Sequence, residues 1–204
     1  MLITFSGKFY FSDDSDVSQV KVVMLGDSLV TWAAHHLLTD PPGLDLQIPG
    51  AEIIWRGIRG CRLKPLDMSL DRVCERGSQP PDILLIHLGT NDIGHSGSAW
   101  ELRTLVRAFI REAHRRFPRA LLVWSDILPR QRWLGMSDQR AAMKILKGMN
   151  ASAHRIICAL GGVVITHKLI KYNKLDLFND YVHLSKTGNS ILCNDWREGL
   201  SRLL

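Results

Sequence analysis

Three short segments, met in order along the chain, contain the side chains that hydrolysis of an ester requires. Residues 26–29 (GDSL) offer a serine hydroxyl, residues 89–92 (GTND) a side-chain amide, and residues 180–183 (DYVH) a carboxylate three positions before an imidazole. A hydroxyl attacks a carbonyl when a base removes its proton, and an amide N–H stabilises the oxyanion that forms. Together the three segments predict nucleophilic catalysis by Ser28.

Ser28 follows an apolar run and precedes a helical pattern, which places its hydroxyl at the carboxyl edge of a parallel sheet. The same position also suits a serine that only caps a helix. Among eight histidines, His183 is the predicted base, because Asp180 can hold its imidazole in one tautomer from the same local turn. His95, shortly after the GTND segment, is the alternative base, whereas His87, inside an apolar run, is expected to be a packed core histidine.

The ordered set of motifs resembles the SGNH (GDSL) hydrolase family, from about Val20 to Leu204. This resemblance implies a metal-independent serine esterase without a cofactor. It implies that Ser28 forms an acyl-enzyme, that His183 acts as general base and then as general acid, and that Asp180 orients His183. An acyltransferase that uses the same residues is the alternative reaction.

The resemblance also implies an oxyanion hole made by the backbone N–H of the nucleophile, the Gly60 N–H and the Asn91 amide. Gly57 is an alternative to Gly60, because WRG at 55–57 stands where many members have an asparagine before the loop. Asp27 and Asp92 are expected to hold loops by accepting bonds from backbone N–H groups rather than to act as acids.

The chain resembles two branches of the family, the second more loosely than the first. Residues 127–130 (ILPR) and 181–185 (YVHLS) resemble the catalytic subunits of intracellular platelet-activating-factor acetylhydrolase, which implies a short acyl group such as acetyl and a small ester or lipid substrate. The short, basic domain also resembles the esterase domain in the first reading frame of some vertebrate non-LTR retrotransposons. That second resemblance implies a longer protein that self-associates as a homo-oligomer.

Short apolar runs alternate with segments of helical period, which predicts an α/β fold. With the resemblance, we expect a three-layer, doubly wound, flavodoxin-like domain over residues 20–204, preceded by an arm or loop at 1–19. Its five parallel strands are expected at Val20–Leu25, Ala51–Trp55, Ile83–Leu88, Ala120–Trp124 and Val163–Thr166. The helices are expected at Leu29–Leu38, Leu63–Arg76, Ala99–Arg116, Ser137–Leu160 and Ser190–Leu203.

Composition narrows the class of protein. The chain has 204 residues, 46% of them hydrophobic and 23% charged, which is ordinary for one globular domain. Four cysteines without a CxxC pair or zinc spacing favour free thiols in a reducing compartment. No signal peptide or membrane-spanning run is evident, so we expect an intracellular, cytoplasmic protein.

A row of arginines lies outside the hydrolase motifs. Four of them recur every fourth residue within one expected helix: Arg103, Arg107, Arg111 and Arg115. The whole chain has a formal net charge of +6, and we call these four residues the arginine stripe. An anionic membrane surface or nucleic acid is the kind of partner that this stripe would bind. The simpler interpretation is a solvated outer helix face. An alternative function is a basic module that binds nucleic acid or membrane and whose esterase activity is incidental.

Overall fold

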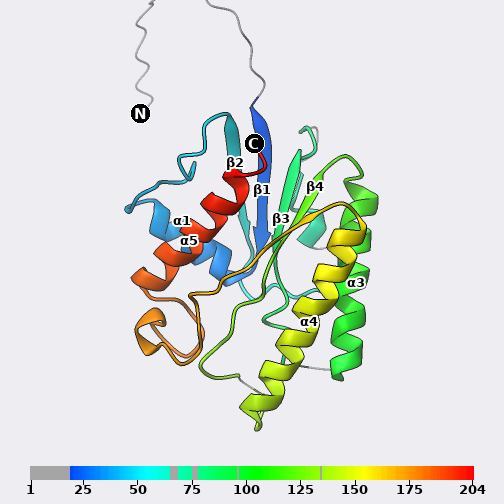
Figure 1. Cartoon of the computed structure of the whole chain (residues 1–204), viewed down its shortest axis with the longest axis vertical. Helices are drawn as coiled ribbons and strands as arrows, with labels where there is room; N and C mark the ends of the chain where they lie inside the picture. The colour runs from blue at the N-terminus through cyan, green and yellow to red at the C-terminus, as the bar shows by residue number, and fades with distance from the viewer. Residues whose placement is uncertain (1–18, 65–68, 75–77, 96, 134) are drawn as a thin grey trace, which may run out of the picture.

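A computed structural model of the chain describes residues 19–64, 69–74, 78–95, 97–133 and 135–204. Strands alternate with helices along most of it (Figure 1). The strands are β1 (Val20–Gly26), β2 (Ala51–Gly57), β3 (Ile83–His87), β4 (Leu121–Ser125) and β5 (Val163–Ile165). The helices are α1 (Ser28–Leu37), α3 (Ala99–Arg116), α4 (Gln139–Ala159) and α5 (Lys186–Ser201), with a short 3₁₀ helix at Leu175–Leu177.

The five strands form one sheet in the order β2-β1-β3-β4-β5, and every neighbouring pair is parallel. β3, at the centre of the sheet, is buried along its whole length, and β1 is buried from Val22 onward. Such strands carry apolar side chains on both faces, which is why they appear in the sequence as continuous apolar runs. This order is that of a flavodoxin-like sheet, as expected.

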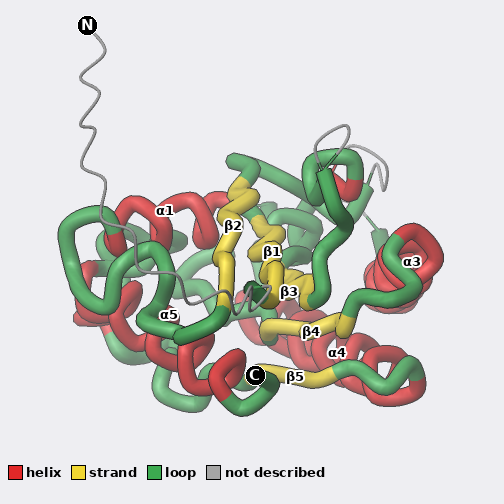
Figure 2. The backbone as a smooth tube through the Cα atoms, turned by 90° about the horizontal axis from the view of Figure 1, so that it is seen from above, coloured by secondary structure: helices red, strands yellow, loops and turns green. Residues whose placement is uncertain are grey.

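Helices cover both faces of the sheet, which gives three layers. α1 and α5 pack on one face, and α3 and α4 pack together on the other (Figure 2). Each face has its own apolar core: Phe109 of α3 and Met149 of α4 belong to one, and Val30 of α1 and Trp196 of α5 to the other. The carboxyl ends of the strands and the loops that follow them lie at one edge between these layers.

The expected elements match the structure within a few residues, with two differences. α5 begins at Lys186 rather than Ser190, because the Ser185 hydroxyl accepts a hydrogen bond from the Gly188 N–H and caps the helix earlier. Part of the helix expected at 63–76 lies outside the described residues, and its described part is helical only at Ser69 and Leu70. The arm expected at 1–19 also lies outside them, apart from Gln19.

Candidate active site

Ser28 is the first residue of α1, directly after the end of β1. Asp27, not Ser28, caps this helix: its carboxylate accepts a hydrogen bond from the Leu29 N–H at 2.9 Å. The Ser28 hydroxyl is therefore free of the capping role that its position alone would allow. The backbone N–H of Ser28 lies in the first turn, where N–H groups have no partner within the helix and can bind an anion.

His183 lies beside Ser28, although 155 positions separate them in the sequence. The distance from Ser28 Oγ to His183 Nε2 is 3.3 Å, and the distance from His183 Nδ1 to Asp180 Oδ2 is 2.8 Å. The structure thus brings together the three side chains that the motifs predict. Ser28 is half-buried, while His183 and Asp180 lie in the loop before α5, open to solvent on one side.

The Asp180–His183 loop is held by hydrogen bonds of its own. Asp180 Oδ1 accepts bonds from the Val182 and His183 N–H groups, each at 2.6 Å, while Oδ2 faces the imidazole. Partial burial alone would raise the pKa of Asp180, but the bonds from His183 and Val182 lower it below its usual value. Asp180 is thus an ionised carboxylate in a fixed orientation, as a group that orients an imidazole must be.

His95, the alternative base, and His87, the expected core histidine, bond to other groups. His95 is exposed in the loop after β3, and its backbone N–H bonds to Asp92 O. His87 is fully buried at the end of β3, as expected of a core histidine, and its Nδ1 lies 2.8 Å from Ser125 Oγ. Within the described parts of the chain, the imidazole hydrogen-bonded to Ser28 is that of His183.

Asn91, in the loop after β3, lies beside Asp27, the residue before Ser28. Its amide nitrogen donates to Cys61 O at 3.0 Å and, over a long 3.4 Å, to Asp27 Oδ2. Its amide oxygen accepts a 2.8 Å bond from Arg130 Nη2. Because an arginine can only donate, the amide oxygen of Asn91 faces Arg130 and the amide nitrogen faces Cys61 and Asp27. Arg130 belongs to residues 127–130, but its contact with Asn91 could not be predicted, because nothing in the chain order links the two residues.

Gly60 lies in the turn after β2 that the resemblance indicated. Cys61 N donates to Ile58 O across this turn, and Gly60 has a φ of +68°, in the left-handed region that favours glycine. The alternative, Gly57, ends β2 against α1: a Cβ there would lie 2.4 Å from Thr31 Oγ1. Gly57 is thus required by close packing, which explains that glycine without any role in binding an oxyanion.

Two buried aspartates hold the loops of the site, as expected. Besides capping α1, Asp27 has its pKa raised by complete burial. Asp92 accepts the Leu63 N–H with both carboxylate oxygens, at 3.1 and 3.3 Å, and burial raises its pKa to about 6. The described residues contain no group of three or more His, Cys, Asp or Glu arranged to hold a metal ion.

Comparison with known proteins assigns the chain to a family. A sequence model of the GDSL-like Lipase/Acylhydrolase family matches residues 24–191, which include Ser28, Asn91, Asp180 and His183. The chain belongs to this family. As a GDSL hydrolase it hydrolyses carboxylic esters. A search of the described residues finds no helix long and apolar enough to cross a membrane.

Individual relatives agree with this assignment. The chain is 27% identical to platelet-activating factor acetylhydrolase IB subunit alpha1 of Pongo abelii over 95% of this chain and 81% of that protein. Two solved structures share its fold. One is a member of the lipolytic protein G-D-S-L family from Veillonella parvula, at a TM-score of 0.69 and 16% identity over 89% of this chain and 98% of that one. The other is the psychrotrophic esterase EstA from Pseudoalteromonas sp., at a TM-score of 0.63 and 19% identity over 91% of this chain and 98% of that one.

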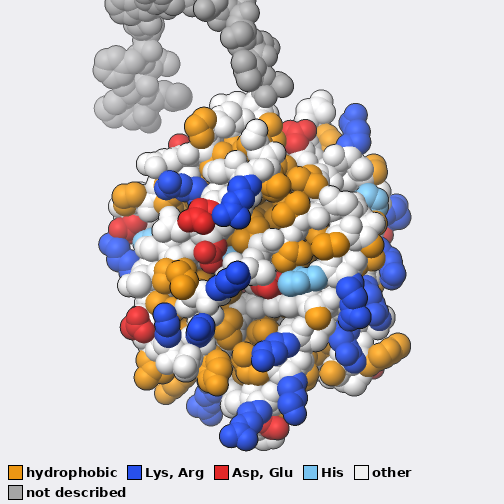
Figure 3. All heavy atoms as spheres, viewed as in Figure 1, with side chains coloured by type: hydrophobic (Ala, Val, Ile, Leu, Met, Phe, Trp, Pro, Cys, Tyr) orange, Lys and Arg blue, Asp and Glu red, His pale blue; other side chains and the backbone are white. Residues whose placement is uncertain are grey.

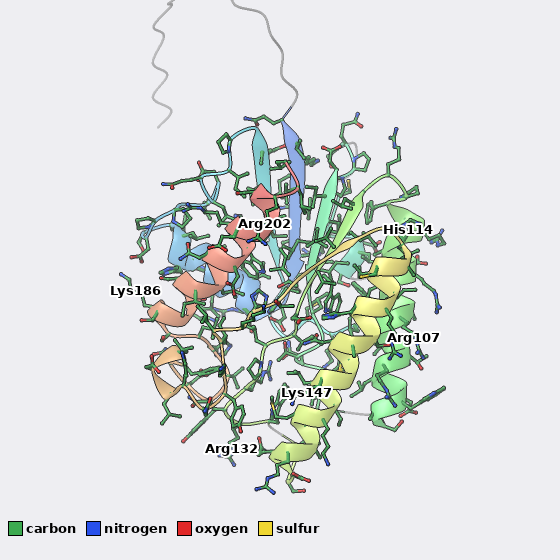
Figure 4. The ribbon with its side chains drawn as sticks, viewed as in Figure 1. Arg107, His114, Arg132, Lys147, Lys186 and Arg202 are labelled. Carbon is green, nitrogen blue, oxygen red and sulfur yellow. The ribbon has the colours of Figure 1, made fainter. Side chains whose placement is uncertain are left out.

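Two aromatic side chains at the mouth of the site contact arginines. Trp32 of α1 packs edge-on against the His183 ring, with centroids 6.2 Å apart, and the Arg59 guanidinium lies 5.4 Å from the centre of the Trp32 ring. Arg132 lies 5.9 Å from the ring centre of Tyr181, and Figure 4 labels it in the lower part of the view. Two arginine guanidinium groups therefore lie against aromatic side chains that neighbour His183, one in contact with its ring and one two positions before it.

A second set of serine, histidine and aspartate, which the sequence analysis missed, is buried behind the first. Ser125 Oγ lies 2.8 Å from three nitrogens, which are His87 Nδ1, His167 Nε2 and Trp196 Nε1. His167 Nδ1 in turn lies 2.8 Å from Asp195 Oδ2. Ser125 is fully buried, whereas Asp195 at the end of the network is partly exposed, and the network ties β3, β4 and α5 together.

The arginine stripe lies on α3, on the far side of the molecule from α1 (Figure 4). Arg115 is paired with Glu112 at 2.6 Å, whereas Arg103 and Arg107 bond to Ala99 O and Thr104 Oγ1 of their own helix. Part of the stripe's charge is therefore balanced within α3. The stripe lies outside the group of side chains around Ser28.

Proposed function

We propose that this GDSL hydrolase cleaves carboxylic esters through an acyl-enzyme on Ser28. The observation that carries the proposal is the hydrogen-bonded chain from Ser28 Oγ through His183 to Asp180. His183 takes the hydroxyl proton as Ser28 attacks the acyl carbon, and it then gives that proton to the leaving alcohol. In the second half of the reaction, His183 takes a proton from water as the water attacks the acyl carbon. His183 then gives that proton to Ser28 Oγ as the acid leaves, which restores the hydroxyl of Ser28.

The oxyanion in this proposal binds to three N–H groups: the backbone N–H of Ser28, the Asn91 amide and the backbone N–H of Gly60. Arg130 supports the role of Asn91, because its bond to Oδ1 leaves the amide nitrogen as the donor on the side of Asp27. The 3.4 Å bond to Asp27 is the weaker of the two amide bonds, so that N–H can turn to an oxyanion at small cost. Neutral donors of this kind stabilise the transition state without trapping a charged product.

We propose a short acyl group, acetyl above all, because the relative from Pongo abelii is named an acetylhydrolase. The test is hydrolysis of p-nitrophenyl esters of increasing acyl length by the wild type, by Ser28→Ala and by the control Ser201→Ala, which removes an exposed hydroxyl at the end of α5. We expect kcat/KM to be highest for the acetyl ester and Ser201→Ala to match the wild type. Activity that rises with chain length would contradict the acetyl preference.

Hydrolysis and acyl transfer use the same residues, so their products decide between them. With a primary alcohol added to the assay, a hydrolase releases free acid at a rate that the alcohol hardly changes. An acyltransferase instead forms mainly the new ester. We expect free acid as the main product.

A further inference from the structure

A hollow of about 280 Å³ lies beside the candidate site, between the loop after β4 and the N-terminal half of α4. Arg130, Gln131 and Trp133 line it from the loop, and Tyr172 lines another side. α4 contributes the side chains of Arg140, Met143, Lys144 and Lys147. We call this hollow the basic pocket.

Three donors on residues that line the basic pocket have no acceptor within the part of the chain that the structure describes. They are Arg130 Nε, Gln131 Nε2 and Trp133 Nε1, all buried. Arg130 and Trp133 are only 8% and 2% exposed, so bulk solvent does not readily supply the missing acceptor. An unpaired buried donor costs about 1–3 kcal/mol. All three unpaired groups are N–H, so what satisfies them is a group that offers several acceptor oxygens.

The charge of the basic pocket favours the same kind of group. Its lining includes four cations, Arg130, Arg140, Lys144 and Lys147, and no aspartate or glutamate. Among the described residues none of the four forms an ion pair. Figure 3 shows Lys and Arg side chains gathered on this face around the lower part of α4, and Figure 4 places Lys147 there. Arg130 is also attracted to the carboxylates of Asp27 and Asp180, whereas the charge of Arg140, Lys144 and Lys147 faces no carboxylate in the pocket lining and attracts an anion.

Other walls of the basic pocket are apolar or aromatic. Trp133 packs under the Arg130 guanidinium, 5.5 Å from the ring centre, and Met143 and Tyr172 line the hollow as well. A free inorganic anion would use only the N–H groups and the cations. A ligand with an anionic group on an apolar or aromatic skeleton would use both kinds of surface.

The basic pocket is connected to the catalytic residues by direct hydrogen bonds. Arg130 donates to Asn91 Oδ1 at 2.8 Å. The backbone N–H groups of Gln131 and Arg132 donate to Tyr181 O, at 3.1 and 3.3 Å, within the loop that carries His183. Arg130 and Gln131 thus line the basic pocket and also bond to residues of the candidate active site.

We propose that the basic pocket binds a carboxylate or phosphate group on an apolar or aromatic skeleton, and that it selects esters carrying such a group. The anion accepts hydrogen bonds from Arg130, Gln131 and Trp133 and is neutralised by Arg140, Lys144 and Lys147. Selection of a substrate rests on the function proposed above, whereas binding of the anion does not.

Binding is tested without any reaction, by titration calorimetry with phenyl phosphate at low salt. The pocket variant is Arg140→Gln/Lys144→Gln/Lys147→Gln, in which all three side chains are exposed and can be changed without loss of the fold. The control variant, Arg111→Gln/Arg119→Gln/Arg155→Gln, removes the same charge from exposed arginines outside the pocket. We expect the pocket variant to bind roughly tenfold more weakly or worse, and the control to bind like the wild type. Equal weakening in both variants, or no binding by the wild type, would overturn the proposal.

Selection is tested with two esters that differ by one carboxylate, phenyl acetate and 4-acetoxybenzoate. We expect the wild type to favour 4-acetoxybenzoate in kcat/KM, and the pocket variant to lose that preference while keeping its rate on phenyl acetate. A preference that survives in the pocket variant would refute selection by the pocket. Phenyl phosphate binding that depends on the pocket, with no hydrolysis of either ester, would refute the proposed function and leave the anion site standing.

Discussion

His87 is predicted to make this protein less stable in acid, for reasons that lie in its buried network. When His167 is neutral and donates from Nδ1 to Asp195, its Nε2 accepts the Ser125 hydroxyl proton. Ser125 Oγ then accepts N–H bonds from Trp196 and from His87 Nδ1. This leaves His87 Nε2 as a buried lone pair without a partner in the described structure. Protonation of His87 Nε2 would create a buried, positively charged N–H group without a hydrogen-bond acceptor in the described structure.

The size of the effect follows from the pKa of His87. Burial, and then the neighbouring His167, lowers this pKa from 6.5 to about 3. Below pH 6.5 the unfolded chain therefore binds a proton that the folded chain refuses, so stability falls as the pH falls toward 3. The single group removes about 2 kcal/mol of the free energy of unfolding between pH 8 and pH 5. The full difference, reached below pH 3, is about 5 kcal/mol.

Urea denaturation at pH 8 and pH 5 measures this directly in the wild type and in His87→Asn, whose amide can still donate to Ser125. The variant is expected to be less stable at pH 8, because a smaller side chain leaves space in the core. Its loss of stability between the two pH values should be smaller by about 2 kcal/mol. His114→Asn, on the outer side of α3, is the control and should keep the wild-type difference. The same pH difference in His87→Asn and wild type would refute the reasoning.

Three further predictions concern the site and its surroundings. Asn91→Ala should lower kcat by about 10²–10³ with little change in KM, in steady-state assays on the acetyl ester; a change confined to KM would make Asn91 a substrate-binding group. Asp180→Asn should lower kcat by about 10⁴, less than loss of Ser28 or His183; an unchanged kcat would remove Asp180 from the mechanism. Changing the whole arginine stripe to Gln should leave hydrolysis of a small soluble ester unchanged. If the stripe binds nucleic acid, the affinity for RNA should fall with salt at a log–log slope of about −0.9 per phosphate contacted, and the variant should lose this binding. If wild type and variant bind RNA and anionic vesicles equally weakly, the stripe is a solvated surface.

Much of the fold could be predicted from local patterns. Strands such as β3 are buried on both faces, so their sequence is uniformly apolar, and α3 shows its core face through residues such as Leu102, Val106 and Phe109. The order of the strands could not be read from these patterns, because every parallel order has similar runs. It came from the resemblance that the motifs support. The early start of α5 was missed because Ser190, five positions after Ser185, offers a second serine at which a helix could begin.

The proximity of Ser28, Asp180 and His183 could be predicted because two of them share one loop and the third opens a helix at the same edge of the sheet. Arg130 and the Ser125–His167–Asp195 network could not. Their partners come from different strands and helices, and no short segment contains them together. Such contacts depend on the register and packing of the finished fold, which a single sequence does not state.

The central claim, that Ser28 is the nucleophile, is tested most directly by covalent labelling. The Pseudoalteromonas esterase of the same fold has been solved inhibited by monoethylphosphonate, so an organophosphonate is the reagent of choice. Intact-mass measurement followed by peptide mapping should find one adduct, on Ser28, formed in step with the loss of esterase activity. Ser28→Ala should take up no label and lose nearly all activity, a loss of order 10⁶ in kcat in a well-studied serine hydrolase. An adduct on another serine that accompanies inactivation, or a Ser28→Ala protein that keeps more than roughly a tenth of the wild-type rate, would contradict the account.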